Sequence, residues 1–203
     1  MRRHIHQRRR QPRTRGQALV ELALAGTLLF LLLAAAVDLG LIFFTLQGMR
    51  VAAQEGATFG SYPVQIMQNG QLQRVDLNYA EIVRRVRNAG GNQTSGFANL
   101  HDLDNNGVFD ELEADRPVHS NWASSDAYIQ VELLKGLNPS RGLTPTCATD
   151  QRGKDMQAGG TACWVRVTVR SDYQFLFPLA PSFANTVRLQ TQAIMPIRSS
   201  YSN

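Results

Sequence analysis

Residues that serve common enzyme chemistry are scarce in this chain. Its 203 residues include two cysteines and four histidines, and two of these histidines, His4 and His6, lie in the arginine-rich beginning of the sequence. The other two, His101 and His119, have no cysteine partner, and there is no G-x-S-x-G serine motif, phosphate-binding glycine loop or zinc-ligand spacing. The sequence therefore predicts a protein that is not an enzyme. A membrane-anchored hydrolase that depends on His101 and His119 remains a rival hypothesis.

Acidic residues are absent from the first 20 positions, where basic residues gather. The arginines of this segment are Arg2, Arg3, Arg8, Arg9, Arg10, Arg13 and Arg15. After Gly16 the balance reverses, because 14 basic residues face 16 acidic ones. Binding along a phosphate backbone requires dense positive charge, so the composition excludes nucleic acid as the main partner.

A long apolar run follows the arginines. From Ala18 to Leu46 the only charged residues are Glu21 and Asp38. A helix from Leu22 to Leu46 would rise about 37 Å, which exceeds the hydrocarbon thickness of about 30 Å. We therefore expect a single-pass protein of the cell (inner) membrane, with a cytoplasmic leader and an extracytoplasmic remainder by the positive-inside rule. A secretory signal peptide is the rival, but its apolar region is shorter and ends in a small-residue cleavage site. The apolar run of this chain is too long for that and continues directly into more helix.

The two carboxylates in this run need an explanation. An unpaired carboxylate at the centre of a spanning helix costs about 2.5 to 3.5 kcal/mol on insertion scales, so each should find a partner or reach the interface. For Asp38 we expect an interfacial position on a tilted helix. Glu21 either lies in the headgroup zone beside the arginines or pairs with a charge on another subunit.

The helical pattern continues past the membrane run. One stripe at helical spacing contains small and apolar residues, namely Leu46, Met49, Ala52, Ala53, Gly56, Ala57 and Gly60. The pattern predicts one helix from about Leu19 to Gly60. Its small-residue face can pack on the protein's own sheet or on another subunit, because small side chains let a neighbouring backbone approach closely.

The rest of the sequence predicts an α+β fold. Asn78 and Glu81 form a capping box for a second helix over Tyr79 to Asn88, before Gly90-Gly91. Period-two alternation then predicts an antiparallel sheet of about three strands with one wet face. The alternating runs lie at residues 128–133, 165–170 and 187–193. The domains expected are a basic cytoplasmic leader over 1–16, a transmembrane and extended helix over 17–60, and an extracytoplasmic α/β head over 61–203.

Two further features belong to the head. A disulfide between Cys147 and Cys163 is the expected state outside the membrane, closing a loop of about 15 residues and stabilising by roughly 3 kcal/mol. Two free thiols remain the alternative. We expect the apolar segment from Phe175 to Pro181 to be a buried turn, whereas exposure would mark a partner site.

A calcium-binding loop is predicted in an insertion around residues 102–113. The pattern D-x-[DN]-x-[DN]-G-x5-E places its oxygen donors on Asp102, Asp104, Asn106, the Val108 carbonyl, Asp110 and Glu113, with Gly107 at the turn. No convincing helix precedes Asp102, so we expect a lone loop with a dissociation constant for Ca²⁺ of about 10⁻⁴ to 10⁻³ M and a structural role. An acidic surface turn without an ion is the alternative.

The segment Arg15-Gly16-Gln17-Ala18-Leu19-Val20-Glu21 before an apolar helix resembles the processing site of type IV pilin-like proteins. Val37-Asp38-Leu39-Gly40 and Ala52-Ala53-Gln54-Glu55-Gly56-Ala57 are similar to the TadE-like family of the tight-adherence (Tad, or Flp) pilus system, and the last 40 residues are loosely similar. Leu22 and Leu41 depart from the family pattern, which often has an aromatic and a basic residue there.

This resemblance implies a non-enzymatic pseudopilin or minor pilin that a prepilin peptidase cuts between Gly16 and Gln17. Other Tad pilins or pseudopilins, the assembly platform and membrane lipid would be its further partners. The new α-ammonium of Gln17 could then pair with Glu21 of a neighbouring subunit and set the register between them. The alternative is an uncleaved, signal-anchored adhesion or interaction module that binds calcium.

Overall fold

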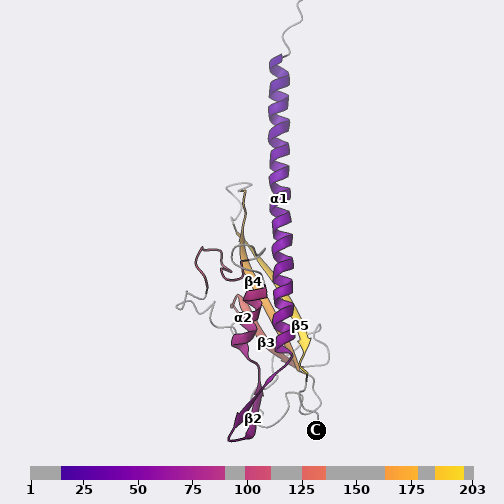
Figure 1. The fold of residues 1–203 in the computed structure, drawn as a ribbon. Helices are drawn as coiled ribbons and strands as arrows, with labels where there is room; N and C mark the ends of the chain where they lie inside the picture. Colours follow the sequence, from indigo (N-terminus) through magenta and orange to yellow (C-terminus); the bar gives the residue numbers. More distant parts are fainter. Residues whose placement is uncertain (1–14, 90–98, 111–124, 136–162, 178–185, 199–203) are drawn as a thin grey trace, which may run out of the picture.

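The computed structural model describes residues 15–89, 99–110, 125–135, 163–177 and 186–198. Its two helices are α1 (Arg15–Gly60) and α2 (Tyr79–Ala89). Its strands are β1 (Val64–Gln68), β2 (Gln71–Asp76), β3 (Ile129–Lys135), β4 (Cys163–Gln174) and β5 (Thr186–Pro196). The half of α1 after Asp38 lies against the sheet. The half before Asp38, here called the free half, is mostly exposed and extends away from the rest of the protein (Figure 1). The predicted α+β class is confirmed.

The main sheet has three antiparallel strands, as predicted, and their order is β3-β4-β5. Strand β4 is central, and its Val165, Val167 and Val169 are fully buried on the face that forms the core. Val167 lies opposite Val131 of β3 and Ala193 of β5. The alternate positions of β4 carry polar side chains such as Arg166, which pairs with Glu132 of β3 at 2.5 Å. The alternation of apolar and polar side chains along each strand therefore determines which face of the sheet is buried and how neighbouring strands align.

The second half of α1 covers this sheet with its small-residue face. Ala52, Ala53 and Ala57 are fully buried, while residues on the opposite side, including Arg50, are exposed. A Cβ added to Gly56 would lie 2.5 Å from Cγ2 of Val86 in α2. Packing on the protein's own core is therefore confirmed as a use of this face.

Helix α2 begins at its predicted cap and ends one residue later than predicted. The Glu81 backbone N–H donates to Oδ1 of Asn78 at 3.2 Å, and Ile82 and Val86 face the core. The Glu81 carboxylate does not complete the reciprocal bond of a capping box. It pairs with Arg84 at 2.6 Å and with Arg85 at 3.1 Å, and the hydrogen bond from Arg84 is the main reason that the pKa of Glu81 falls to about 2.

A small hairpin of β1 and β2 was not predicted. Its two-residue turn is Asn69-Gly70, with φ of 53° and 76°, which is the combination that a type I′ turn requires. The Asn-Gly pair between two short strand-forming runs was the available signal. Figure 1 places the hairpin at the opposite end of the head from the free half of α1.

Candidate functional site

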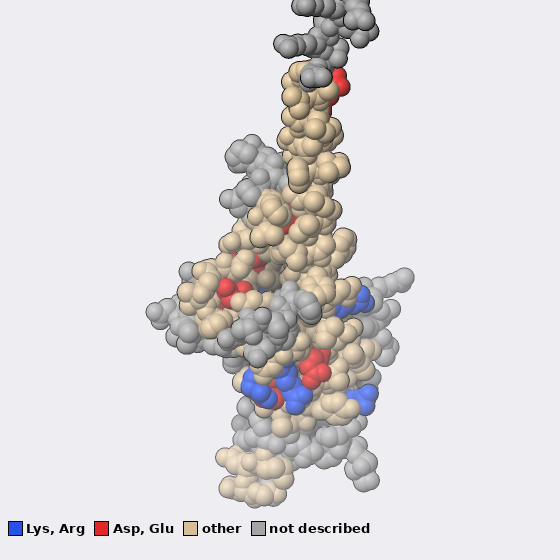
Figure 2. Space-filling view, turned by 45° about the horizontal axis from the view of Figure 1, so that its top comes forward, with Lys and Arg blue, Asp and Glu red and all other residues tan. Residues whose placement is uncertain are grey.

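The free half of α1 is an apolar surface with almost no protein contact. Leucine and phenylalanine side chains are exposed all around it between Leu19 and Leu33. Within the described residues, α1 is the one helix long and apolar enough to cross a membrane. Figure 2 shows it as a column of uncharged residues apart from acidic atoms near its end. Length, composition and exposure together indicate a membrane-anchored protein.

The residues of the predicted processing site lie in the first turns of this free half. Gly16, Gln17 and Glu21 are all exposed, and no atom lies within 4 Å of a Cβ built on Gly16. The Gln17 side-chain amide donates to Oε1 of Glu21 at 3.0 Å, so the glutamate has a neutral partner within its own helix. Both cleavage and pairing between subunits stay predictions.

Asp38 marks the point where α1 meets the head. Its side chain is buried, at 1% exposure, and it accepts hydrogen bonds from the backbone N–H groups of Leu176 at 2.9 Å and Phe177 at 3.3 Å. The Tyr173 hydroxyl donates a longer bond of 3.4 Å. Burial and the nearby carboxylate both raise the pKa of Tyr173, so its hydroxyl stays a donor. The sequence predicted an interfacial aspartate but not these protein partners.

Protein contacts along α1 therefore begin earlier than the sequence suggested. Ile42 and Leu46 pack against the core, and Thr45 and Met49 are buried. The part of α1 before Asp38, residues 17–37, would rise about 32 Å as a helix, which is still enough to cross the hydrocarbon layer. Asp38 thus lies close to the end of a spanning segment rather than inside one.

The acidic loop brings three of the predicted calcium ligands together. Carboxylate oxygens of Asp102, Asp104 and Asp110 lie within 4.8 Å of one another, and Asp102 and Asp110 are buried. Burial raises the pKa of Asp110 to about 7, and repulsion from the other two carboxylates acts in the same direction. A divalent cation held by oxygen ligands would offset both penalties, so the donor set fits Ca²⁺.

The backbone of the loop folds around Asp102. Its carboxylate accepts hydrogen bonds from the N–H groups of Asn106 at 2.9 Å and Gly107 at 3.0 Å. Asn105 and Gly107 adopt φ of 55° and 87°, a conformation that glycine and asparagine tolerate best. The structure therefore contains a tight turn where the spacing predicted one.

The remaining predicted ligands are placed less completely. The Asn106 amide donates to Asp104 at 2.9 Å, and its oxygen accepts the Val108 N–H at 2.7 Å. Glu113, predicted as the bidentate ligand, lies outside the described residues. The full ligand set thus stays a prediction.

The loop is fastened to the end of β4. The Asp172 N–H donates to the Leu103 carbonyl at 2.7 Å, and the Gln174 side chain donates to the Asn105 carbonyl at 3.0 Å. Leu103 is buried in the core. The end of β4 therefore contacts both the acidic loop, through Asp172 and Gln174, and Asp38, through Tyr173.

Cys163 is fully buried at the start of β4 and is disulfide-bonded. Cys147 lies outside the described residues. The pair that the sequence predicts remains a prediction.

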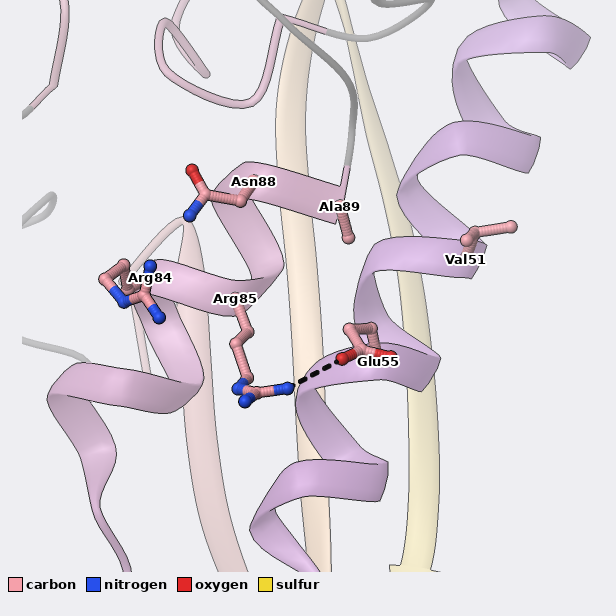
Figure 3. Close-up of a pocket in the computed structure, with 6 residues that line it drawn as sticks. All are labelled: Val51, Glu55, Arg84, Arg85, Asn88 and Ala89. Carbon is pink, nitrogen blue, oxygen red and sulfur yellow. Dashed lines mark hydrogen bonds and ion pairs between the residues drawn. The ribbon is translucent and has the colours of Figure 1, made fainter.

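A groove of about 440 Å³ lies between α1 and α2, lined by Val51, Glu55, Arg84, Arg85, Asn88 and Ala89 (Figure 3). Arg85 pairs with Glu55 at 3.1 Å and stacks over Phe59 at 4.3 Å, and Arg84 pairs with Glu81. Each charged side chain of this groove thus has an ion-pair partner, Arg85 with Glu55 inside the groove and Arg84 with Glu81 outside it. The hydrolase hypothesis depends on His101 and His119; neither lines this groove, and His119 lies outside the described residues, so it stays a hypothesis.

The sequence model of the TadE-like protein family matches residues 16–58. No curated protein and no solved structure matches the chain significantly. The family match covers the whole of α1 apart from its ends, so the predicted TadE-like resemblance is confirmed for this helix. This likeness of α1 suggests a pilin-like protein associated with Tad pili.

Proposed function

We propose that this chain, TadE-like over residues 16–58, is a non-enzymatic pseudopilin or minor pilin that a prepilin peptidase processes between Gly16 and Gln17. The observation that carries the proposal is the continuity of α1 from Arg15 to Gly60, with one half free and apolar and the other half packed on the head. Such a helix can hold the protein in the membrane and present the head on one side. The arginines before Gly16 favour a cytoplasmic beginning and an extracytoplasmic head.

Processing would change the chemistry at the end of the helix. Cleavage leaves an α-ammonium on Gln17, and in a low dielectric that charge needs a carboxylate partner. Glu21 is exposed and has only a neutral hydrogen-bond partner from its own chain in the described contacts, so it remains able to accept a second donor. Pairing with the ammonium of a neighbouring pilin or pseudopilin would set the register between subunits. Inner-membrane lipid and the assembly platform complete the proposed set of partners.

N-terminal sequencing of protein extracted from membranes tests the processing step. With prepilin peptidase present, the first residue should be Gln17, and a Gly16→Trp variant should keep the complete leader. Gly26→Trp is the matched control, since Gly26 also lies in the free half with open space around its Cβ. An intact leader in the wild type would instead favour the uncleaved adhesion or interaction module.

We also propose that the acidic loop binds Ca²⁺ through Asp102, Asp104, Asn106, the Val108 carbonyl, Asp110 and Glu113. The support is the convergence of three carboxylates and the raised pKa of Asp110. The ion would order the loop against the end of β4, which is a structural role. A sensor role has no support in these contacts.

Calorimetric titration of the detergent-solubilised full chain with CaCl₂ tests this site. We expect a dissociation constant of about 10⁻⁴ to 10⁻³ M, weakened at least tenfold by Asp104→Asn, which removes one ligand charge while keeping the shape. Asp126→Asn, an exposed acidic residue outside the loop, should leave binding unchanged. Equal heats for wild type and Asp104→Asn would contradict the proposal.

A further inference from the structure

The turn that follows β4 exposes apolar side chains beside α1. Leu176 is 61% exposed and Phe177 is 42% exposed, which corrects the expectation of a buried turn from Phe175 to Pro181 for these two residues, while Phe175 is half-buried and residues 178–181 lie outside the described residues. On α1, exposed apolar residues continue next to Asp38, among them Val37, Leu39 and Leu41. The two elements together present an apolar collar, made of Leu176, Phe177, Val37, Leu39 and Leu41, at the level where the free half of α1 ends. Apolar patches of this kind on a protein surface mark an interaction site.

The depth of this collar along α1 is fixed by Asp38. Strand β4 runs in the opposite direction to α1, because Val165 lies near Gly60 and Tyr173 reaches Asp38. Figure 1 shows the strand running alongside α1 toward the free half. Two backbone N–H groups of the turn are bound to the Asp38 carboxylate. The turn therefore cannot shift along the helix without losing both hydrogen bonds.

This depth coincides with a membrane surface. If residues 17–37 cross the bilayer, their length of about 32 Å brings Asp38 to the far boundary of the hydrocarbon layer. Apolar side chains at such a boundary typically bury about 5–10 Å into the region between headgroups and acyl chains. Phe175, Leu176 and Phe177 carry no charge that would oppose entry, and the carboxylate beside them is already satisfied by the turn.

We propose that the turn at residues 175–177 is a second membrane contact, which inserts Leu176 and Phe177 into the extracytoplasmic leaflet and is positioned there by Asp38. The proposal rests on the membrane anchoring proposed for α1. It assigns the occupant of the collar to lipid, because the exposed apolar side chains of the free half continue along α1 through Leu33 and Val37 to Leu39 and Leu41, beside the turn that Asp38 holds. The consequence is a head held at a fixed tilt and height on the bilayer, rather than one that swings on a single helix.

Fluorescence quenching by brominated lipids tests this contact on the full chain, with Trp122 and Trp164 replaced by phenylalanine. Leu176→Trp should show a blue shift and a loss of emission in vesicles of phosphatidylcholine and phosphatidylglycerol brominated near the headgroup end of the acyl chain. Met67→Trp, on the exposed hairpin at the opposite end of the head, should show neither. Phe30→Trp, on the free half of α1, should be quenched most by bromine placed deep in the chain.

These reporters separate the two levels of the proposal. Quenching at residue 30 without quenching at residue 176 would overturn the second contact alone. An absence of quenching at residue 30 would overturn the membrane anchoring itself. Shielding of residue 176 that depends on protein density, and not on bromine, would assign the collar to a second subunit and also overturn the proposal.

A second measurement addresses the positioning role of Asp38. Asp38→Ala removes both acceptors and should reduce quenching at residue 176 while leaving residue 30 unchanged. Asp38→Asn keeps the shape and one acceptor, so we expect an intermediate loss. If both variants retain full quenching at residue 176, Asp38 does not position the turn.

Discussion

The two halves of α1 are one continuous helix in two different surroundings. Before Asp38, large apolar side chains such as Leu29 and Phe30 are exposed on every side. After Asp38, exposed apolar residues continue to Phe44, and from Gln47 onward one side carries alanine and glycine against the core while the other carries mainly polar residues such as Gln54. The exposed fraction of a side chain therefore does not show whether that side chain faces lipid or water. An exposed leucine in the first half and an exposed glutamine in the second half are each matched to a different solvent.

The position of Asp38 at the junction follows from the same comparison. A carboxylate cannot face lipid cheaply, and a buried one needs donors. The turn after β4 supplies backbone N–H donors at that point. Asp38 thus lies at the boundary between the half of α1 that has few protein contacts and the half that packs on the head.

The largest difference between the two halves should appear when the same charge is placed on an exposed position in each. Leu29 is 65% exposed and Val51 is 55% exposed, so their exposed fractions alone would predict similar effects of a substitution at either position. We expect Leu29→Asp to weaken membrane insertion by about 3 kcal/mol, because an aspartate would face the bilayer interior. Val51→Asp should have little effect, since its side chain faces water. Carbonate extraction of membranes measures both, and equal retention of the two variants would contradict the assignment of solvents.

A second experiment adds bulk instead of charge. Gly56→Leu should destabilise the head by up to about 3 kcal/mol, because even a Cβ at Gly56 would lie 2.5 Å from Val86. Gly26→Leu in the free half should leave unfolding of the head unchanged, as its Cβ would meet nothing within 4 Å. Thermal unfolding followed by near-ultraviolet circular dichroism separates the two variants. If they melt together, the small-residue face does not hold α2 against α1.

Local patterns predicted most of this fold. Helical spacing gave α1 and its buried face, the Asn78 cap gave the start of α2, and period-two alternation gave all three strands of the main sheet. The acidic loop was predictable for the same reason, because its carboxylates converge through a turn within a few residues. The hairpin at Asn69-Gly70 is also a local feature, and its Asn-Gly turn is a signal of the same local kind.

Contacts between distant residues were not predictable in this way. The sequence showed that Asp38 needs a partner, but its donor on Leu176 lies 138 residues away. The exposure of Leu176 and Phe177 was predicted wrongly for a related reason. In a protein surrounded by water, apolar side chains are expected to be buried away from the solvent. Beside the free half of α1, the same side chains can face lipid instead.

The smallest expected effect concerns pH, because the head contains paired titratable side chains and the first half of α1 contains few titratable side chains. Arg188 donates to both Asp172 oxygens, at 2.7 and 2.9 Å, and this pairing lowers the pKa of Asp172 below its ordinary value of 3.8. Burial and the same carboxylate raise the pKa of Tyr128 to about 12, so its hydroxyl remains a donor to Asp172 at neutral pH.

A lowered carboxyl pKa stabilises the folded state above the unfolded pKa, and this contribution is lost as pH falls through the folded pKa. Arg188→Gln should therefore reduce the difference in unfolding free energy between pH 7 and pH 3 by about 1 kcal/mol or less, since Arg188 is largely exposed. Arg50→Gln removes the same charge from the exposed side of α1 and should leave that difference unchanged. Chemical denaturation at the two pH values measures the effect. Identical pH profiles for both variants would show that net charge, and not the pair with Asp172, governs the acid sensitivity of the head.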